Sequence, residues 1–413
     1  MGEVEQKCAK AKAASSLMKN ASTSEKNKAL LAIASALRQN SAQILAANKK
    51  DLSASSSLPL SVRKRLELSE NSILSMASGF ELISKFSDPV GQTVKKWRLK
   101  NNLHISRVRV PLGVIAFIYE SRPNVTAEAT FLALKSGNAI VLRGGKEAIN
   151  TNKALVRIMR NALSTTSLPT DAIQLIEDIS HEGAATLMKQ RGLVDVLIPR
   201  GGAGLIRAVV DNAKVPFIET GAGNCHAFVD SSADLASAER IILNAKLTSP
   251  YVCNALEHVL VHEKIAANLL PHLYASLQNA GVEVRGCERT RRILPNAKLM
   301  SESEQYQEYL DLIIGIKIVD SAEQAITHIN KYSTHHSDAI ITRNKANAKL
   351  FTQQVDSCCT YVNASTRFTD GYTMGFGGEV GISTQRLHVR GPIGLEELTT
   401  TKLIIEGTGQ IRE

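Results

Sequence analysis

The chain has 413 residues and a formal net charge of +10, with 44% hydrophobic and 21% charged residues, a composition that excludes a disordered polypeptide. No segment approaches the ~18 consecutive apolar residues of a membrane helix, and the N-terminus lacks a signal-peptide core, so we expect a soluble, cytoplasmic protein. Lys and Arg are scattered among acids and aromatic residues make up 4%, which argues against nucleic-acid binding. An anionic small substrate or cofactor explains the positive charge more simply.

The first ninety residues predict helices. Ser22 and Glu25 have the spacing of a capping box, and apolar residues follow at helical intervals. Residues 92–110 then alternate polar and apolar side chains around Asn101 and Asn102, which predicts a β-hairpin. An ordinary surface hairpin and a partner-binding hairpin are equally compatible with this pattern.

From residue 113 to residue 365, short apolar segments alternate with helical segments. This alternation is typical of βαβ units and predicts an α/β protein with parallel sheets. The expected strands include PFIET at 216–220. We expect two α/β domains that divide near residue 230.

Glycines and cations follow the predicted strands at 139–143 and 194–198. Gly201 and Gly202 precede a predicted helix, where small residues let backbone N–H groups approach a phosphate, although a tight turn without a ligand is equally compatible. Neither glycine segment fits GxGxxG, and the Walker pattern is absent, which argues against a P-loop kinase. Arg143 and Lys146 suit the 2′-phosphate of NADP, with a solvated cationic edge as the alternative.

Cys253 is the candidate nucleophile. It follows Pro250 and Tyr251 and begins the segment CNALE, where a helix N-terminus would favour its thiolate. A buried, unreactive cysteine is the alternative. His258 and His262 share one face of a predicted strand without a third ligand spaced for zinc, so no metal site is expected. The absence of GxSxG leaves a Ser/His/Asp triad without support.

Several segments carry motifs that together are diagnostic of one family. They are RVRVPLGVIAFIYESRPNVT (107–126), LKSGNAIVLRGGKEA (134–148), LIPRGGAGLI (197–206), PFIETGAGNCH (216–226), VCNALE (252–257), and the segments 308–340, 363–371 and 379–402. Through nearly its whole length, the chain resembles the γ-glutamyl phosphate reductases (glutamate-5-semialdehyde dehydrogenases), a branch of the aldehyde dehydrogenase superfamily.

The resemblance implies an aldehyde-dehydrogenase-like fold. It implies a Rossmann-type NADP-binding domain at 1–91 and 109–230 and an α/β catalytic domain at 231–384. A small β oligomerisation element would combine a hairpin at 92–108 with a C-terminal strand at 396–413. The expected assembly is a homo-oligomer.

The resemblance also implies an activity. This activity is the NADPH-dependent reduction of L-glutamyl 5-phosphate to L-glutamate 5-semialdehyde and phosphate, through a cysteine thioester and without a metal. It is the second step of proline biosynthesis, and it implies functional coupling to a glutamate 5-kinase. The alternatives are a hydrolytic or coenzyme A-acylating aldehyde dehydrogenase, or, from another class, a basic binding protein or inactive scaffold.

The family motifs assign roles to individual residues. They match Cys253 to the catalytic cysteine, Glu219 to the glutamate of hydrolytic relatives, Arg143 to the adenosine-ribose contact, Gly201 and Gly202 to the pyrophosphate turn, and Glu308 to the nicotinamide-ribose glutamate. By their charge, Arg122 and Arg367 are candidates for anchoring anionic groups of the substrate. Ser121 and Asn124 are candidates for contacting the developing oxyanion.

The chain departs from the family pattern at two places. Where the branch reads NAKTQRPxVCNA, this chain reads NAKLTSPYVCNA, so residues 247–251 lack an arginine just before the nucleophile. Weaker phosphate affinity or altered loop geometry is the expected consequence. The common YEARPN is YESRPN here, which adds a hydroxyl group at Ser121.

Overall fold

The computed structural model describes residues 2–120 and 122–412, so Ser121 lies outside the described residues. The described chain divides into two compact units. Unit 1 runs to Thr220 and also includes Gly375–Gly381 and the C-terminal segment from Ile393, whereas unit 2 comprises Gly221–Met374 and Ile382–Pro392. The division falls before the expected position near residue 230, because the strand over 225–229 pairs with strands of unit 2.

Unit 1 begins with the predicted helices. Their bounds are α1 (Glu3–Met18), α2 (Thr23–Gln39), α3 (Ser41–Ala54), α4 (Leu60–Leu66) and α5 (Glu70–Ser84). The predicted capping box is confirmed, because the backbone N–H of Ser22 donates to the Glu25 carboxylate at 2.8 Å while the Ser22 hydroxyl accepts from the Glu25 N–H at 3.3 Å.

A parallel sheet in the order β5-β4-β3-β6 forms the centre of unit 1. Its strands are β3 (Val114–Tyr119), β4 (Ala139–Arg143), β5 (Ile173–Leu175) and β6 (Val196–Arg200), and its helices are α6 (Pro123–Lys135), α7 (Ile149–Leu163), α8 (His181–Met188) and α9 (Ala203–Asn212). All of β3 is buried, as expected for a strand with both faces covered. Phe80 of α5 and Phe131 of α6 pack edge to face, with ring centroids 5.3 Å apart.

The predicted strand at 216–220 is wrong. The structure has single bridge residues there instead of a strand, at Phe217, which pairs with Leu197, and at Thr220. The Leu197 N–H donates to the Pro216 carbonyl and the Ile218 N–H donates to the Leu197 carbonyl. Further pairing along β6 would need an N–H at Pro199, which proline lacks. The segment instead continues as irregular chain toward the end of unit 1.

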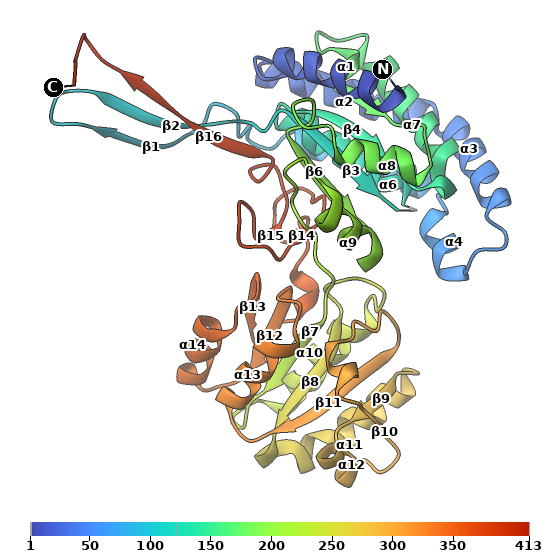
Figure 1. The fold of residues 1–413 in the computed structure, drawn as a ribbon. Coiled ribbons are helices and arrows are strands. Elements are labelled where there is room, and N and C mark those ends of the chain that lie inside the picture. Colours follow the sequence, from blue (N-terminus) through green and yellow to red (C-terminus); the bar gives the residue numbers. More distant parts are fainter. Residues whose placement is uncertain (1, 121, 413) are drawn as a thin grey trace. The chain divides into compact units, whose positions relative to one another are not determined.

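An antiparallel sheet in the order β1-β2-β16 joins the predicted hairpin to the C-terminal strand. The strands are β1 (Thr93–Arg98), β2 (His104–Pro111) and β16 (Thr399–Glu406). Figure 1 shows these three strands as a long ribbon, which is a separate sheet from the β5-β4-β3-β6 sheet of the same unit. Several apolar side chains of this ribbon are exposed, among them Val94, Leu403 and Ile405.

Unit 2 contains a second parallel sheet, in the order β10-β9-β11-β8-β7-β12-β13. The strands are β7 (Cys225–Val229), β8 (Leu256–His262), β9 (Glu283–Gly286), β10 (Lys298–Leu299), β11 (Ile313–Val319), β12 (Ser337–Ile341) and β13 (Cys359–Val362). The helices are α10 (Leu235–Leu247), α11 (Glu263–Asn279), α12 (Glu288–Ile293), α13 (Ala322–Tyr332) and α14 (Lys345–Gln354), and a short antiparallel pair combines β14 (Ile382–Ser383) with β15 (Gly391–Pro392). Strands β7 and β8 are buried along their whole length, so the predicted α/β alternation is confirmed.

Candidate active site

The predicted cofactor residues of unit 1 gather at one edge of its sheet. Arg143 ends β4, and Gly201 and Gly202 follow β6. Glu120, which was not among the predicted residues, follows β3 at the same edge. These strands are parallel neighbours, so their carboxyl ends meet at the same edge, where α/β sheets commonly bind ligands.

The turn between β6 and α9 passes close to a carboxylate. The Gly202 N–H donates to Glu120 Oε2 at 3.0 Å, and a Cβ added to Gly201 would lie 2.6 Å from the Glu120 carboxyl carbon. A side chain at position 201 would therefore displace the exposed carboxylate of Glu120. The Gly202 N–H at the start of α9 thus donates to a negatively charged oxygen, which is the kind of acceptor that a pyrophosphate would provide.

The two predicted cations at this edge differ in whether their charged group is available to bind a ligand. Arg143 donates from Nη2 to the carbonyl oxygens of Ile179 and Ser180, both at 2.8 Å, and burial lowers the pKa of its guanidinium. It therefore fixes the loop that leads into α8. Lys146 is exposed in the turn after β4, and its ammonium has no hydrogen bond or ion pair with other described residues.

Three further predicted residues also lie in unit 1. Glu219 is half-buried in the segment after α9. Arg122 precedes α6, where its backbone N–H donates to the Glu120 carbonyl at 2.6 Å. Asn124 lies in the first turn of α6 and donates its amide to Glu128 Oε1 at 3.0 Å.

Cys253 lies in unit 2, in the turn between α10 and β8. The predicted helix N-terminus at this position is wrong, because the segment 252–255 is a short turn and the residues after it form a buried strand. The alternating, β-branched sequence LEHVLVH favours that strand. Cys253 is partly exposed and lies at the amino edge of the parallel sheet.

Gly223 brings the Cys253 turn and Glu308 together. A Cβ built on Gly223 would lie 1.4 Å from the carbonyl oxygen of Cys253, so no residue with a side chain fits without moving that turn. The Gly223 N–H donates to Glu308 Oε1 at 2.6 Å. The thiol of Cys225 donates to the same Cys253 carbonyl at 3.2 Å. Burial raises the pKa of Glu308.

Asn254 connects the nucleophile turn to the segment 365–369. Its amide donates to the Thr369 carbonyl at 2.8 Å, and its own carbonyl accepts from the Thr366 hydroxyl at 2.8 Å. The guanidinium of Arg367 donates to its side-chain oxygen. The predicted residue Arg367 is thus bonded to the residue directly after Cys253.

Lys246 and Glu257 form a buried ion pair beneath this edge. They flank the nucleophile turn, at the end of α10 and in β8, with Lys246 Nζ 2.7 Å from Glu257 Oε2 and both side chains 0% exposed. Glu257 Oε1 also accepts from the Leu310 N–H at 3.2 Å. Burial raises the pKa of the Glu257 carboxyl to about 7 and lowers the pKa of Lys246. This pair joins both ends of the turn to the chain that carries Glu308.

Residues 2–120 and 122–412 contain no cluster of three or more His, Cys, Asp or Glu side chains arranged to hold a metal ion. In the same residues, no helix has both the length and the apolar character needed to cross a membrane.

Comparisons with known proteins show the family of this chain. A family model described as "Aldehyde dehydrogenase family" matches residues 2–292. The chain is 53% identical, over 100% of its length and 100% of the relative, to a protein of Carboxydothermus hydrogenoformans named gamma-glutamyl phosphate reductase. The chain belongs to the aldehyde dehydrogenase family. Within that family it groups with the γ-glutamyl phosphate reductases.

Two more relatives have the same name. The protein from Moorella thermoacetica is 53% identical over 100% of this chain and 99% of its own length. The crystal structure of the protein from Thermotoga maritima has a TM-score of 0.98 at 49% identity, with 100% of each chain covered. The aldehyde-dehydrogenase-like α/β fold expected from the sequence is therefore confirmed.

The sequence did not indicate several residues of this candidate site. Gly223, Asn254 and the pair of Lys246 and Glu257 were not among the expected site residues. The family segments NAK and CNALE contain three of them, but a motif does not show which side chains meet. A glycine pattern could have indicated Gly223 only as a turn.

We predict that Lys246→Met destabilises the fold by about 3–5 kcal/mol, because it leaves the Glu257 carboxylate buried without its partner. The isolated carboxyl must stay protonated when folded, although it ionises near pH 4.3 when unfolded. Between that pH and its raised folded pKa, the native state binds more protons, so the variant loses stability as pH rises. Urea unfolding at pH 6 and pH 8 measures both effects.

The control is Lys246→Met combined with Glu257→Gln. The glutamine keeps an acceptor for the Leu310 N–H but has no charge to bury, so the double variant should recover part of the lost stability and show no added pH dependence. A single variant that loses less than about 1 kcal/mol, or that follows the pH dependence of the double variant, would contradict the buried-pair argument.

Proposed function

We propose that this chain reduces L-glutamyl 5-phosphate to L-glutamate 5-semialdehyde and phosphate with NADPH, as the second step of proline biosynthesis. The carrying observation is a partly exposed cysteine in a turn that Gly223, Glu308 and Arg367 hold from separate segments. Full-length identities near 50% to proteins named gamma-glutamyl phosphate reductase support the same assignment.

The residues of unit 1 fit a nicotinamide dinucleotide. The Gly202 N–H, which donates to the exposed Glu120 carboxylate in this structure, could donate to a pyrophosphate oxygen if that side chain moves. Lys146 provides an exposed cation at the end of β4, which suits the 2′-phosphate that distinguishes NADPH from NADH. Glu308 is the proposed ligand of the nicotinamide ribose, and Arg143 shapes the adjoining loop.

The proposed chemistry begins at Cys253. Its thiolate attacks the acyl carbon of the substrate, a C–S bond forms, and the C–O bond to phosphate breaks with its electron pair leaving on phosphate. Bound NADPH supplies the hydride that converts the resulting thioester to the aldehyde. As the C–S bond breaks, its electron pair returns to the Cys253 sulfur, which regenerates the thiolate.

Cationic side chains and N–H donors would bind the negatively charged groups of the substrate and of the oxyanion. Arg367, bonded beside Cys253, is the proposed anchor of an anionic substrate group, and Arg122 is a second candidate. Asn124 is the proposed side-chain donor to the oxyanion, together with backbone N–H groups of the Cys253 turn. Glu219 remains the candidate base, the role that its counterpart has in hydrolytic relatives.

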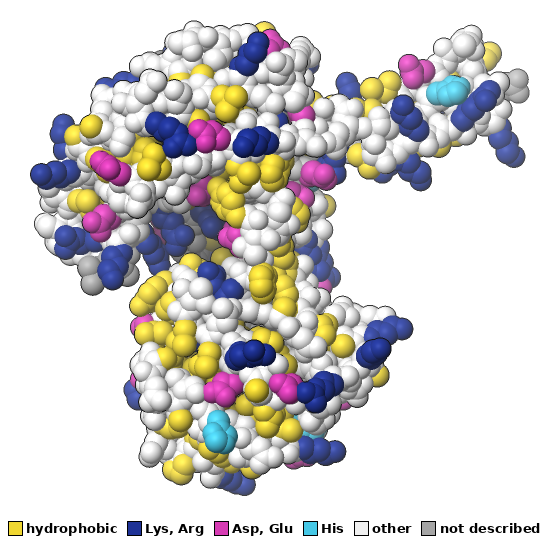
Figure 2. Space-filling model, turned by 180° about the vertical axis from the view of Figure 1, so that it is seen from behind, with side chains coloured by type: hydrophobic (Ala, Val, Ile, Leu, Met, Phe, Trp, Pro, Cys, Tyr) yellow, Lys and Arg dark blue, Asp and Glu magenta, His cyan; other side chains and the backbone are white. Residues whose placement is uncertain are grey.

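We further propose that the protein acts in the cytoplasm as a homo-oligomer. The β1-β2-β16 ribbon supports an assembly role, because it exposes apolar side chains and its outer strands have unpaired edges. The family implies functional coupling to a glutamate 5-kinase that supplies the substrate, which suits an acyl phosphate because such compounds hydrolyse readily. On the face that Figure 2 shows, cations are interspersed with acids, which gives no support to a nucleic-acid role.

We predict that Cys253→Ala lowers kcat at least about 1,000-fold, since covalent catalysis is lost, while cofactor binding and the melting temperature stay near wild type. Stopped-flow turnover and cofactor fluorescence measure both. Cys287→Ala is the matched control, because this cysteine is also half-buried in unit 2, and it should retain full activity. Residual activity of a tenth or more in Cys253→Ala would overturn the assignment of the nucleophile.

The second prediction concerns cofactor choice. Wild type should show a higher kcat/KM with NADPH than with NADH, and Lys146→Ala should reduce that ratio about tenfold by removing a cation from the 2′-phosphate. Lys28→Ala, an exposed lysine of α2, should leave the ratio unchanged. Equal use of both cofactors by wild type would contradict the proposal.

The third prediction concerns phosphate. In the reverse direction, the thioester on Cys253 needs an incoming nucleophile, which the acyl-phosphate chemistry assigns to inorganic phosphate. NADPH formation from glutamate semialdehyde and NADP should therefore depend on phosphate and saturate with it. A hydrolytic aldehyde dehydrogenase would run equally well in phosphate-free buffer, and an acylating one would require coenzyme A. Either result would assign another reaction to this site.

A further inference from the structure

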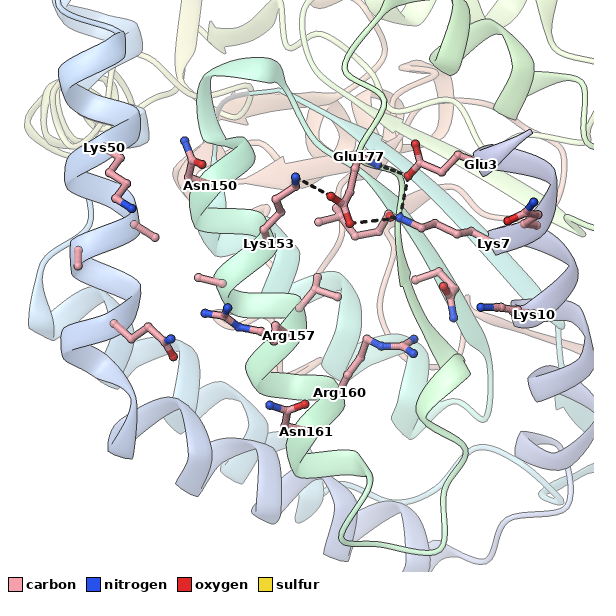
Figure 3. Close-up of a pocket in the computed structure, with 18 residues that line it drawn as sticks. Glu3, Lys7, Lys10, Lys50, Asn150, Lys153, Arg157, Arg160, Asn161 and Glu177 are labelled. Carbon is pink, nitrogen blue, oxygen red and sulfur yellow. Dashed lines mark hydrogen bonds and ion pairs between the residues drawn. The ribbon is translucent and has the colours of Figure 1, made fainter. Parts of the chain in front are cut away.

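A cavity of about 740 Å³ lies in unit 1, and none of the residues that line it belongs to the proposed active site. Figure 3 shows it between α1, α3 and α7, with the end of β5 and the residues after it forming another wall. Its volume is in the range of small-molecule sites. Its walls differ from an ordinary apolar pocket, because Lys, Arg, Asn and Gln side chains make up most of them.

The acidic side chains of the cavity are already neutralised. Glu177 lies 3.4 Å from Lys7 Nζ and 2.5 Å from Lys153 Nζ, and these lysines lower the pKa of its carboxyl. Glu3 pairs with Lys7 at 2.7 Å and also accepts the backbone N–H of Glu177 at 2.7 Å. These bonds attach α1 to the chain after β5, and they leave no acid of the cavity available to other cations.

Arg160, which also lines the cavity, pairs with Asp171 at 3.0 Å. Against the effect of burial, hydrogen bonds from Arg160 and Gln174, with the charges of Arg160 and Lys10, lower the pKa of the Asp171 carboxyl.

Three further cations of the cavity have no ion-pair partner among the described residues. Lys10, Lys50 and Arg157 are exposed, and the structure gives their charged groups no hydrogen bond or ion pair with another described residue. They come from different helices, α1, α3 and α7. Figure 3 shows the Lys10 and Lys50 side chains extending from opposite walls, with Arg157 on the helix between them.

We propose that this cavity binds a small polyanion, a phosphate ester or a polycarboxylate, through Lys10, Lys50 and Arg157. Like charges held on three helices repel one another, and a multiply charged ligand offsets that repulsion. Arginine adds a planar, bidentate donor for carboxylate or phosphate oxygens. Asn150 and Asn161, which also line the cavity, offer polar groups at its walls.

The volume and the lining of the cavity indicate a small, hydrophilic ligand. A volume of about 740 Å³ suits a metabolite rather than a peptide segment, and the cations of the wall that have no ion-pair partner favour an anionic ligand. A bound polyanion would connect α1 and α3 to α7, so binding should stabilise unit 1. This inference does not depend on the reaction proposed for Cys253.

The test is calorimetric titration of the full chain with inorganic pyrophosphate and, separately, with citrate at low ionic strength. We expect saturable binding that Lys10→Gln/Lys50→Gln/Arg157→Gln weakens at least tenfold, and that added salt also weakens. The melting temperature should rise with ligand in wild type and not in the triple variant. The probe that binds more tightly assigns the ligand class.

The matched control is Lys19→Gln/Lys28→Gln/Lys49→Gln. These lysines are exposed on or next to α1, α2 and α3 and do not line the cavity, so this variant removes the same charge without changing the site. Equal affinity of the two triple variants, or saturable binding that the cavity variant retains in full, would overturn the proposal. Absence of saturable binding of both probes to wild type would also overturn it.

A second measurement uses the unmutated protein. Amine acylation followed by mass spectrometry should show Lys10 and Lys50 protected by the bound probe, with Lys49 labelled at an unchanged rate. Equal labelling of Lys50 and its neighbour Lys49 at saturating probe would contradict binding in the cavity.

Discussion

The close approach of Gly223 to the Cys253 carbonyl is the constraint on which the nucleophile turn depends. A side chain at position 223 would overlap that carbonyl oxygen, so the two segments can lie this close only because one of them is glycine. The same Gly223 offers its N–H to Glu308. One residue without a side chain thus sets the distance between the segment of the nucleophile and the segment of the proposed ribose ligand.

The edges of two parallel sheets position the proposed chemistry in different ways. In unit 1, Glu120, Arg143 and the glycine turn follow the carboxyl ends of neighbouring strands. In unit 2, the Cys253 turn and the segment of Glu308 precede the strands β8 and β11, so they meet at the amino edge. Parallel pairing explains both gatherings, because equivalent ends of parallel strands lie side by side.

Buried and exposed charges of this protein differ in what they contribute to stability. The buried pair of Lys246 and Glu257 has no water to screen it, so each member depends on the other. On the surface, cations such as Lys10, Lys50 and Arg157 are solvated and individually contribute little to folding. Their collection in one cavity is therefore better explained by a ligand than by stability. The net charge of +10 is compatible with anionic partners at more than one place.

The sequence by itself determined the α/β class, the helices of the first ninety residues, the β-hairpin and the family. Periodicity and turn residues decide the helices and the hairpin locally. The family follows from motifs spread along the chain, including those around Cys253. Only the tertiary structure decided that Cys253 precedes a strand rather than a helix, and that Gly223, Asn254 and Glu257 support its turn. These contacts join residues far apart in the chain, and a short segment such as CNALE is compatible with either helix or strand until a sheet provides partners for its hydrogen bonds.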